Sequence, residues 1–262
     1  MTGAGLIASS ITIGNHWTTK IGGLTVNIDD LIGCAVAGLI VIGVGLLLRA
    51  GLSVDKPGKL QLAFEAVVEA VTRQAEQTIG PRSRRIIPLV VSLFFFILIA
   101  NWLEMIPTQP TDGGTQYLPA PTGDVNMTFA LALLVIVLVH ASSLAVRGPR
   151  GYGRHYFQPY WYLFPINLIE EIAKPVTLAL RLFGNIFAGG LMLVLFASLF
   201  PPYVVPAGDL IWKLFDGLFV GPIQAFIFSL LTILYFETAM STHDEPAAHR
   251  AKHGEPALVA EI

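Results

Sequence analysis

The chain has 262 residues, of which 54% are hydrophobic and 13% charged, and its mean hydropathy is +0.66. No soluble domain can bury so large an apolar fraction, so the composition excludes a soluble globular protein and predicts an integral membrane protein. The formal net charge of -2 excludes a general basic surface for nucleic acid, and the single cysteine, Cys34, excludes an intrachain disulfide.

The chain begins with a mixed segment, residues 1–30, which we expect to lie outside the cytoplasm. It lacks a basic start, an apolar core and a small-residue cleavage site, so we expect no cleavable signal peptide. Residues 31–48 form an uncharged run of 18 residues that is just long enough to cross a ~30 Å hydrocarbon core. They are the first predicted membrane span.

Residues 60–80 have a different pattern. Apolar side chains fall on one helical face, and Glu65, Glu69, Arg73 and Glu76 fall on the other. This pattern predicts an amphipathic helix that lies along the membrane interface. The alternative is a helix that packs against the soluble part of another subunit.

Two further spans are predicted at 86–105 and 127–146. Basic residues follow the first span, precede the second and follow the third, whereas the loop 107–125 contains Asp112 and Asp124 but no Lys or Arg. Because cytoplasmic loops carry an excess of Lys and Arg, this distribution places the amino terminus outside and the carboxyl terminus in the cytoplasm.

The helical patterns at 162–200 and 209–240 are too long for upright spans. Almost forty residues of helix extend ~60 Å, about twice the thickness of the membrane core. We therefore expect a long, steeply tilted hairpin, followed by a polar cytoplasmic tail at 241–262. The predicted fold is an all-α polytopic protein with about five membrane-embedded helices, one interfacial helix and a single membrane domain over 31–240.

Arg181 is the residue that most needs a functional explanation. It interrupts the apolar segment TLALRLFGNI, and a charge at bilayer depth costs at least ~2.5–3.5 kcal/mol. A helical projection places it in a narrow, mostly polar stripe with Glu170, Lys174, Thr177, Asn185 and Ala188. Such a stripe favours contact with protein or water, although a structural ion pair is the alternative for the arginine.

The last helix carries a complementary pattern. Gly217, Gly221, Gln224 and Phe228 share one face, with Asp216 beside it. Small residues permit the close approach of a neighbouring helix, and Gln224 alone is equally consistent with an ordinary interhelical hydrogen bond.

Four motifs carry a resemblance to a known family. They are NWLEMIP at 101–107, DVNMT at 124–128, LRLFGN at 180–185 with Lys174 and Pro175 upstream, and QAFIF at 224–228. In this order they resemble subunit a of the F-type ATP synthase, over roughly residues 101–240. The resemblance implies a proton-conducting stator in a bacterial cell membrane. Its implied partners are a ring of c subunits, b-type peripheral stalk subunits and the whole complex.

The resemblance also implies roles for individual residues. Arg181 corresponds to the essential arginine that separates two aqueous half-channels and favours the ionised form of a passing ring carboxylate. Asn101 and Glu104 correspond to the outer half-channel, while Asn185 and Gln224 flank the arginine. Glu170 and Glu171 resemble the acidic position of the inner half-channel, and which of them corresponds is open; Lys174 belongs to the same region. No cofactor, metal or bound ATP is implied.

The chain departs from the family at one pair of positions. Many bacterial relatives place coupled ionisable residues where this chain has Gly190 and Gly217. We hypothesise that the adjacent Asp216 supplies the missing group; the alternative is an ion pair between Asp216 and Lys213.

Two other functional classes remain as alternatives. The first is a secondary transporter in which Arg181 binds an anionic substrate, although the sequence contains no inverted repeat to support it. The second is a structural scaffold, which leaves the polar stripe unexplained. His140 is able to titrate near neutral pH, but a hydrogen-bonded packing role is the favoured interpretation.

Overall fold

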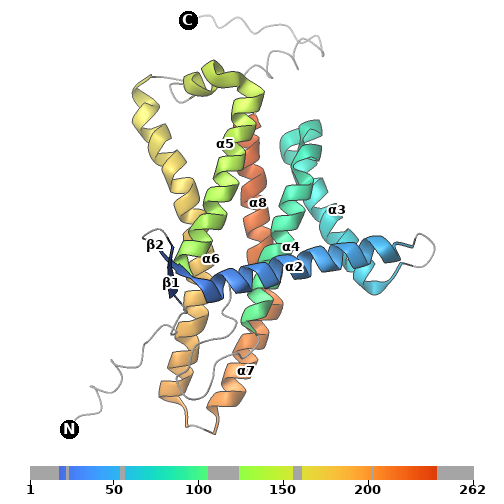
Figure 1. Ribbon diagram of the computed structural model, residues 1–262, viewed down its shortest axis with the longest axis vertical. Helices are drawn as coiled ribbons and strands as arrows, with labels where there is room; N and C mark the ends of the chain where they lie inside the picture. The colour runs from blue at the N-terminus through green and yellow to red at the C-terminus, as the bar shows by residue number, and fades with distance from the viewer. Residues whose placement is uncertain are drawn as a thin grey trace, which may run out of the picture.

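The computed structural model describes residues 18–21, 24–53, 57–105, 124–155, 161–201 and 203–240. The helices in this part of the chain are α2 (Ile28–Gly51), α3 (Lys59–Ile79), α4 (Ile87–Glu104), α5 (Val125–His155), α6 (Phe164–Leu199), α7 (Val205–Phe215) and α8 (Gly221–Met240). Short 3-10 turns, η1 (Gly80–Arg85) and η3 (Trp161–Leu163), precede α4 and α6, and a π-helical turn, η4 (Asp216–Val220), joins α7 to α8. The protein is an all-α polytopic membrane protein, as predicted (Figure 1). The predicted tail, 241–262, lies outside the described residues.

A small β-ribbon precedes the first helix. Strands β1 (Thr18–Ile21) and β2 (Leu24–Asn27) pair antiparallel, with Thr18 opposite Asn27. The sequence interpretation missed this ribbon, although Gly22 and Gly23 separate two runs rich in β-branched residues, which is a recognised hairpin signal.

The core lies between α4, α5, α6 and α8. Its largest fully buried side chains include Phe228 and Phe236 of α8, Ile97 of α4, and Leu178 and Leu182 of α6. In Figure 1, α8 lies between α4 and α5 and contacts both of them. Helix α8 is therefore the central element against which the site residues of α4 and α6 are positioned.

The outer surface is strongly apolar. Four helical segments are long and apolar enough to cross a membrane, namely Asp30–Gly51, Val125–Gly153, Phe164–Leu199 and Val205–Met240, and α4 is a shorter apolar helix. Large side chains such as Leu47, Leu199 and Leu210 are more than half exposed. Apolar exposure of this extent is expected of a surface that meets lipid or other membrane subunits.

Helix α3 uses its apolar face within the chain. Val71 and Ala75 are buried against Val90 and Val91 of α4 and Ile233 of α8, while Glu65, Glu69 and Arg73 remain on the exposed side. The predicted amphipathic pattern is therefore present.

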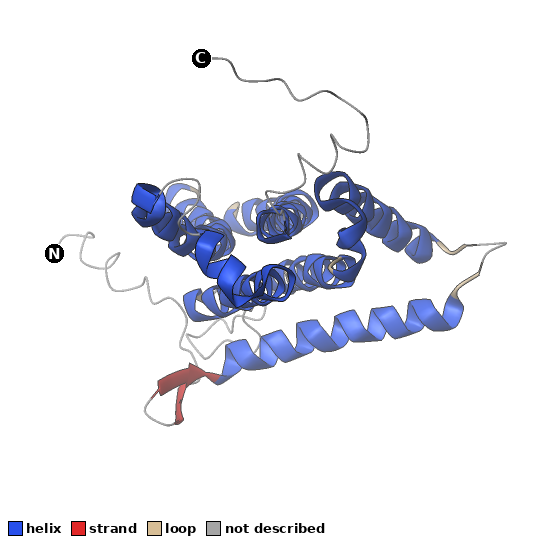
Figure 2. Cartoon of the chain, turned by 90° about the horizontal axis from the view of Figure 1, so that it is seen from above, coloured by secondary structure: helices blue, strands red, loops and turns tan. Residues whose placement is uncertain are grey.

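Helix α2 runs across the other helices. In Figure 1 it lies nearly horizontal while α4, α5 and α8 run vertically, and in Figure 2, seen along that vertical direction, α2 is drawn at full length. The segments Phe164–Leu199 and Val205–Met240 each have 36 residues, or ~54 Å of helix. If α2 crosses the bilayer directly, these long helices are steeply tilted within it, which is the arrangement that their length requires.

Two glycines with positive φ end helical segments. Gly80, with φ 76°, terminates α3, and its N–H donates to the carbonyl of Glu76. Gly148, with φ 70°, precedes Pro149 and breaks α5 into two pieces. A residue before proline avoids helical geometry and glycine accepts a positive φ, so the straight part of α5 ends close to the predicted limit at 146.

Candidate functional site

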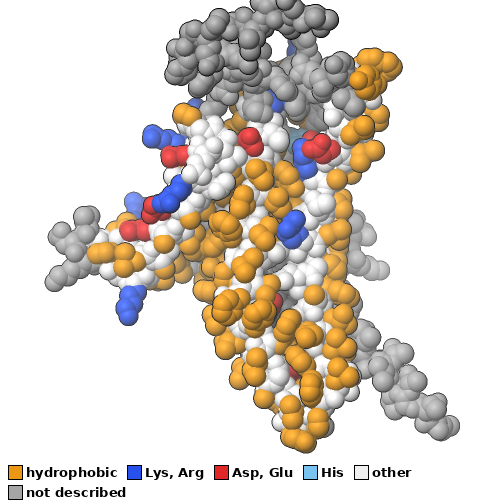
Figure 3. Space-filling model, turned by 180° about the vertical axis from the view of Figure 1, so that it is seen from behind, with side chains coloured by type: hydrophobic (Ala, Val, Ile, Leu, Met, Phe, Trp, Pro, Cys, Tyr) orange, Lys and Arg blue, Asp and Glu red, His pale blue; other side chains and the backbone are white. Residues whose placement is uncertain are grey.

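Most of the stripe of α6 lies on an exposed face. Leu178, Ala179 and Leu182 are buried on a neighbouring face, in the core that α6 shares with α5. Arg181 is exposed, as are Glu170, Thr177 and Ala188, whereas Asn185 is half-buried. From behind, hydrophobic side chains cover the long helical body, and most charged side chains gather at its upper end and on the projecting arm (Figure 3). The stripe therefore forms part of an exposed, largely apolar surface.

The guanidinium of Arg181 has no carboxylate partner in the described part of the chain. The structural ion pair considered as an alternative is therefore not formed there. An unpaired charge on an apolar membrane surface is unfavourable until another group or water meets it.

Gln224 fixes the backbone beneath Arg181. Its side chain is 7% exposed, and Nε2 donates a hydrogen bond of 2.9 Å to the carbonyl oxygen of Arg181. This contact joins α8 to α6 at the level of the arginine. Both interpretations of Gln224 from the sequence are thus compatible with its position: it makes an interhelical hydrogen bond, and it lies beside the arginine.

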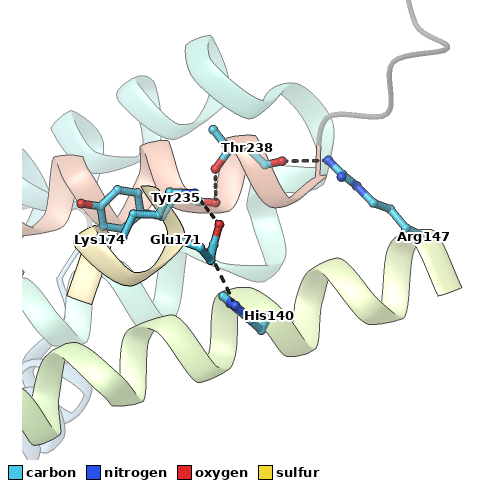
Figure 4. Close-up of polar contacts among 6 residues, drawn as sticks. All are labelled: His140, Arg147, Glu171, Lys174, Tyr235 and Thr238. Carbon is cyan, nitrogen blue, oxygen red and sulfur yellow. Dashed lines mark hydrogen bonds and ion pairs between the residues drawn. The ribbon is translucent and has the colours of Figure 1, made fainter. Parts of the chain in front are cut away.

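Glu171, Lys174 and His140 form a second polar group, nearer the start of α6 (Figure 4). Lys174 Nζ lies 2.9 Å from Glu171 Oε2, and His140 Nε2, from α5, lies 3.5 Å from Glu171 Oε1. The ammonium of Lys174 also lies 5.9 Å from the centre of the Tyr235 ring of α8. Glu170 instead shares the exposed face with Arg181.

Asn101 and Trp102 hold α4 against the π-helical turn before α8. Asn101 is buried, with its Nδ2 3.4 Å from the carbonyl oxygen of Gly221, and Trp102 Nε1 donates to the carbonyl of Gly217 at 2.8 Å. The second bond has a local cause. The backbone N–H of Gly221 donates to the backbone carbonyl of Asp216, and Pro222 has no N–H. The carbonyl of Gly217 therefore has no backbone donor in the next turn of the helix.

Asp216 lies in the same region, on the side of α6. Its half-buried side chain lines a cavity of about 20 Å³ together with Met105, Gly189, Leu193, Trp212 and Lys213. A cavity of this size has room for a water molecule. The carboxylate of Asp216 makes no ion pair with Lys213 in the described part of the chain.

Packing leaves no free space for a side chain at position 217. A Cβ at this position would overlap the side chain of Met105, whereas a Cβ at Gly190 would have no atom within 4 Å. An ionisable side chain at 217 is therefore incompatible with Met105 in its present place. The side chain of Glu104 lies outside the described part of the chain, so its assignment stays a prediction.

Sequence reasoning missed Trp102 and the contact between His140 and Glu171. The signal for Trp102 is Pro222, because a proline inside a helical pattern leaves a carbonyl in need of another donor. No comparable local signal predicts the contact of His140, since it joins two different helices.

Comparison with known proteins extends the similarity over nearly the whole chain. The family described as ATP synthase A chain matches residues 31–237. ATP synthase subunit a of Acidothermus cellulolyticus is 48% identical over 250 residues, which cover 95% of this chain and 90% of that protein. The protein of the same name from Mycobacterium tuberculosis is 48% identical over 246 residues, covering 92% and 98%, and that of Coxiella burnetii is 35% identical over 245 residues, covering 89% and 92%.

Proposed function

The chain belongs to the ATP synthase A chain family, and from this premise we propose that it is the stator that guides protons through two half-channels to and from a rotating ring. Membership makes it a proton-translocating membrane subunit of an F-type ATP synthase, in a bacterial membrane. In this proposal the ring of c subunits is the direct partner, and the b-type peripheral stalk anchors the chain. The chain itself has no site that forms ATP.

The unpaired guanidinium of Arg181 is the observation that supports the proposal most strongly. It lies exposed on an apolar helix face, and its partner is absent from the described part of the chain. A carboxylate carried past by a ring subunit would supply that partner, and the positive charge would favour release of its proton. The same charge opposes a proton that moves directly from one half-channel to the other.

The remaining site residues flank Arg181 along the two long helices. We assign Asn101, Glu104 and Asp216 to the outer half-channel, since Asn101 and Asp216 lie around the π-helical turn beyond Arg181. Glu170, Glu171 and Lys174 belong to the inner half-channel, on the other side of Arg181. Asn185 and Gln224 lie nearest to the arginine, and Gln224 holds its backbone.

The basic ends of the helices support the proposed orientation. Arg84 and Arg85 lie in η1, at the start of α4, and Arg147 caps α8 by a 2.8 Å bond to the carbonyl of Thr238. By the positive-inside rule these segments face the cytoplasm, with the amino terminus outside and the carboxyl terminus inside. An anion-binding transporter fits less well, because such a site lies between repeats and Arg181 lies on an exposed face.

The proposal is tested by ATP-driven proton pumping in inverted vesicles that contain the complete complex. Arg181→Ala removes the charge and Arg181→Lys keeps a charge without the planar guanidinium. We expect both variants to lose pumping, with the alanine variant the more severe. Leu180→Ala, which alters an exposed apolar neighbour, is the matched control and should pump normally. Normal pumping by Arg181→Ala, with the variant chain present in the complex, would contradict the proposal.

A further inference from the structure

His140 and Glu171 come from different helices and meet at the boundary between exposed and buried surface. The imidazole is 32% exposed and the carboxylate 20% exposed, with 3.5 Å between Nε2 and Oε1. This separation is shorter than two successive hydrogen bonds through a water molecule require. A small approach of the two side chains brings them within direct proton-transfer distance.

The second oxygen of Glu171 is already held. Lys174 Nζ lies 2.9 Å from Oε2 and is itself only 15% exposed. The carboxylate is thus fixed on one side by an ammonium group and faces a titratable imidazole on the other (Figure 4). Imidazole is the side chain that exchanges a proton most readily near neutral pH.

We propose that His140 and Glu171 form a proton relay at the inner end of the site, in which His140 collects a proton from the cytoplasmic water and Glu171 passes it toward Arg181. The inference rests on the proposed function. It assigns the inner acidic role to Glu171 rather than Glu170, and it adds His140 of α5 to the residues that move protons.

Each transfer conserves charge and protons. A hydronium ion of the cytoplasmic water gives a proton to the imidazole and becomes water, and the resulting imidazolium gives the proton on Nε2 to Oε1 of Glu171. The imidazole returns to its neutral form, and the carboxyl group releases the proton into the path along α6. Glu171 and Arg181 are ten residues apart, or about 15 Å along the helix.

Lys174 holds Glu171 in place within this relay. Its ammonium group lies 2.9 Å from Oε2, which leaves Oε1 beside His140. Glu170 has no such neighbour among the described residues: its exposed side chain makes no hydrogen bond or ion pair there. A relay residue must be within reach of both its donor and its acceptor, which favours Glu171.

Other charged or titratable groups surround the pair. Helix α5 contributes Tyr152, whose ring centre lies 6.0 Å from that of His140, and Arg147, which is bonded to the carbonyl of Thr238. Helix α8 contributes Tyr235, close to Lys174, and Glu237 lies two residues further along. These neighbours are unchanged in the variants tested below, so a changed pH dependence of uptake would report the loss of His140 or Glu171 itself.

The test measures the initial rate of ATP-driven proton uptake by inverted vesicles between pH 6 and 8 in the outer medium, which is the cytoplasmic side. In His140→Gln, uptake depends directly on free protons, so the rate should fall with rising pH more steeply than in wild type. At pH 8 we expect a loss of roughly tenfold, which is less than the ~10²–10⁴-fold that a positioned proton donor typically contributes, because water still supplies protons. Glu171→Gln should behave in the same way, and the double variant should lose no more than either single variant.

Glu76→Gln is the control, because it removes the same charge from an exposed position of α3 that lies outside the proposed proton path. We expect it to keep the wild-type rate and pH profile. A wild-type profile in His140→Gln, or an equal loss at every pH, would overturn the relay, since a purely structural role lowers the rate uniformly. Should His140→Gln reduce the amount of assembled chain, the pH profile of Glu171→Gln decides the matter by the same criterion.

Arg181→Ala in the same vesicles separates the two proposals. If Arg181→Ala abolishes pumping while His140→Gln and Glu171→Gln retain the wild-type pH profile, only the relay is wrong. If Arg181→Ala pumps normally, the proposed function itself fails.

Discussion

At the scale of single residues, Arg181 and Lys174 differ in whether their positive charge has a carboxylate partner. They are seven positions apart on α6, and Lys174 lies against Glu171 whereas the guanidinium of Arg181 meets no carboxylate in the described residues. A paired charge is stabilised within the subunit, while an unpaired one is available to a group that arrives from outside. The difference follows from which neighbours the fold supplies, not from the residue types.

Asp216 is the residue whose role can be tested most simply. It lines the small cavity beside α4 and α6 and has no ion pair with Lys213 in the described residues. Asp216→Asn keeps the size of the side chain but cannot carry a proton at neutral pH. We expect proton pumping to fall by at least roughly tenfold, because a proton-transfer group is lost.

The matched control for this prediction is Asp209→Asn. It removes a second carboxylate seven positions earlier, on α7, and should leave the rate unchanged. Undiminished pumping by Asp216→Asn, with normal amounts of the chain in the membrane, would remove Asp216 from the proton path.

At the scale of elements, the π-helical turn is the feature that joins α4 to the last helix. Pro222 cannot donate to the turn before it, and Trp102 and Asn101 of α4 approach the carbonyls of Gly217 and Gly221. Irregular turns of this kind often occur at functional sites in long helices. Here the turn directs the segment with Asp216 toward α6, so the backbone irregularity and the site are connected.

Removing the indole N–H of Trp102 should destabilise the natural chain more than a chain that carries Pro222→Ala. In the natural sequence, Trp102→Phe leaves the carbonyl of Gly217 unpaired and should destabilise the chain by about 1–3 kcal/mol. In a Pro222→Ala background a backbone N–H is available, so the same substitution should cost clearly less. The midpoint of thermal release of the chain from the purified complex measures both effects.

Trp212→Phe provides the control, because the indole N–H of Trp212 is buried without an acceptor in the described residues. Removing it should be neutral or slightly stabilising. Equal destabilisation by Trp102→Phe in the two backgrounds would show that Pro222 does not create the need for the bond.

At the scale of the whole molecule, α2 lies across the other helices, so the site is tilted if α2 crosses the bilayer directly. A helix that crosses the bilayer directly changes its depth by ~1.5 Å per residue, and a steeply tilted one changes it far less. Such a tilt would let α6 and α8 present a long surface to the proposed ring while both of their ends remain close to the membrane.

Depth measurements with spin labels test this arrangement. Between Leu39 and Leu46 of α2, we expect the depth to change by about 10 Å, the full rise of seven residues. Between Leu180 and Leu191 of α6, the helix rises about 16 Å, and we expect the depth to change by less than half of that. A change close to the full rise on α6 would show that it stands upright and that the tilt is wrong.

The sequence predicts those parts of the structure that depend on the local spacing of polar and apolar residues. The α6 stripe with Arg181, the amphipathic face of α3 and the long final helices follow from residues three or four positions apart. The contacts that complete the site do not. Trp102 and Gly217 are 115 positions apart, and His140 reaches Glu171 across two helices, so no local pattern encodes them.

The overlap of Gly217 with Met105 is a further example. The sequence shows only a glycine at this position, whereas the structure places the side chain of Met105, just after α4, where a Cβ would lie. Packing between distant segments therefore determines how much room position 217 offers a side chain.

The measurement that tests the central claim most directly is the passive proton conductance of vesicles after the soluble catalytic head has been removed. If Arg181 is the barrier between two half-channels, Arg181→Ala should let protons cross without rotation, and the conductance should exceed that of wild type and persist when the ring is blocked by a carboxyl-modifying reagent. A conductance that remains at the wild-type level and is abolished by that reagent would contradict the account, because protons would still need the ring in the absence of the charge.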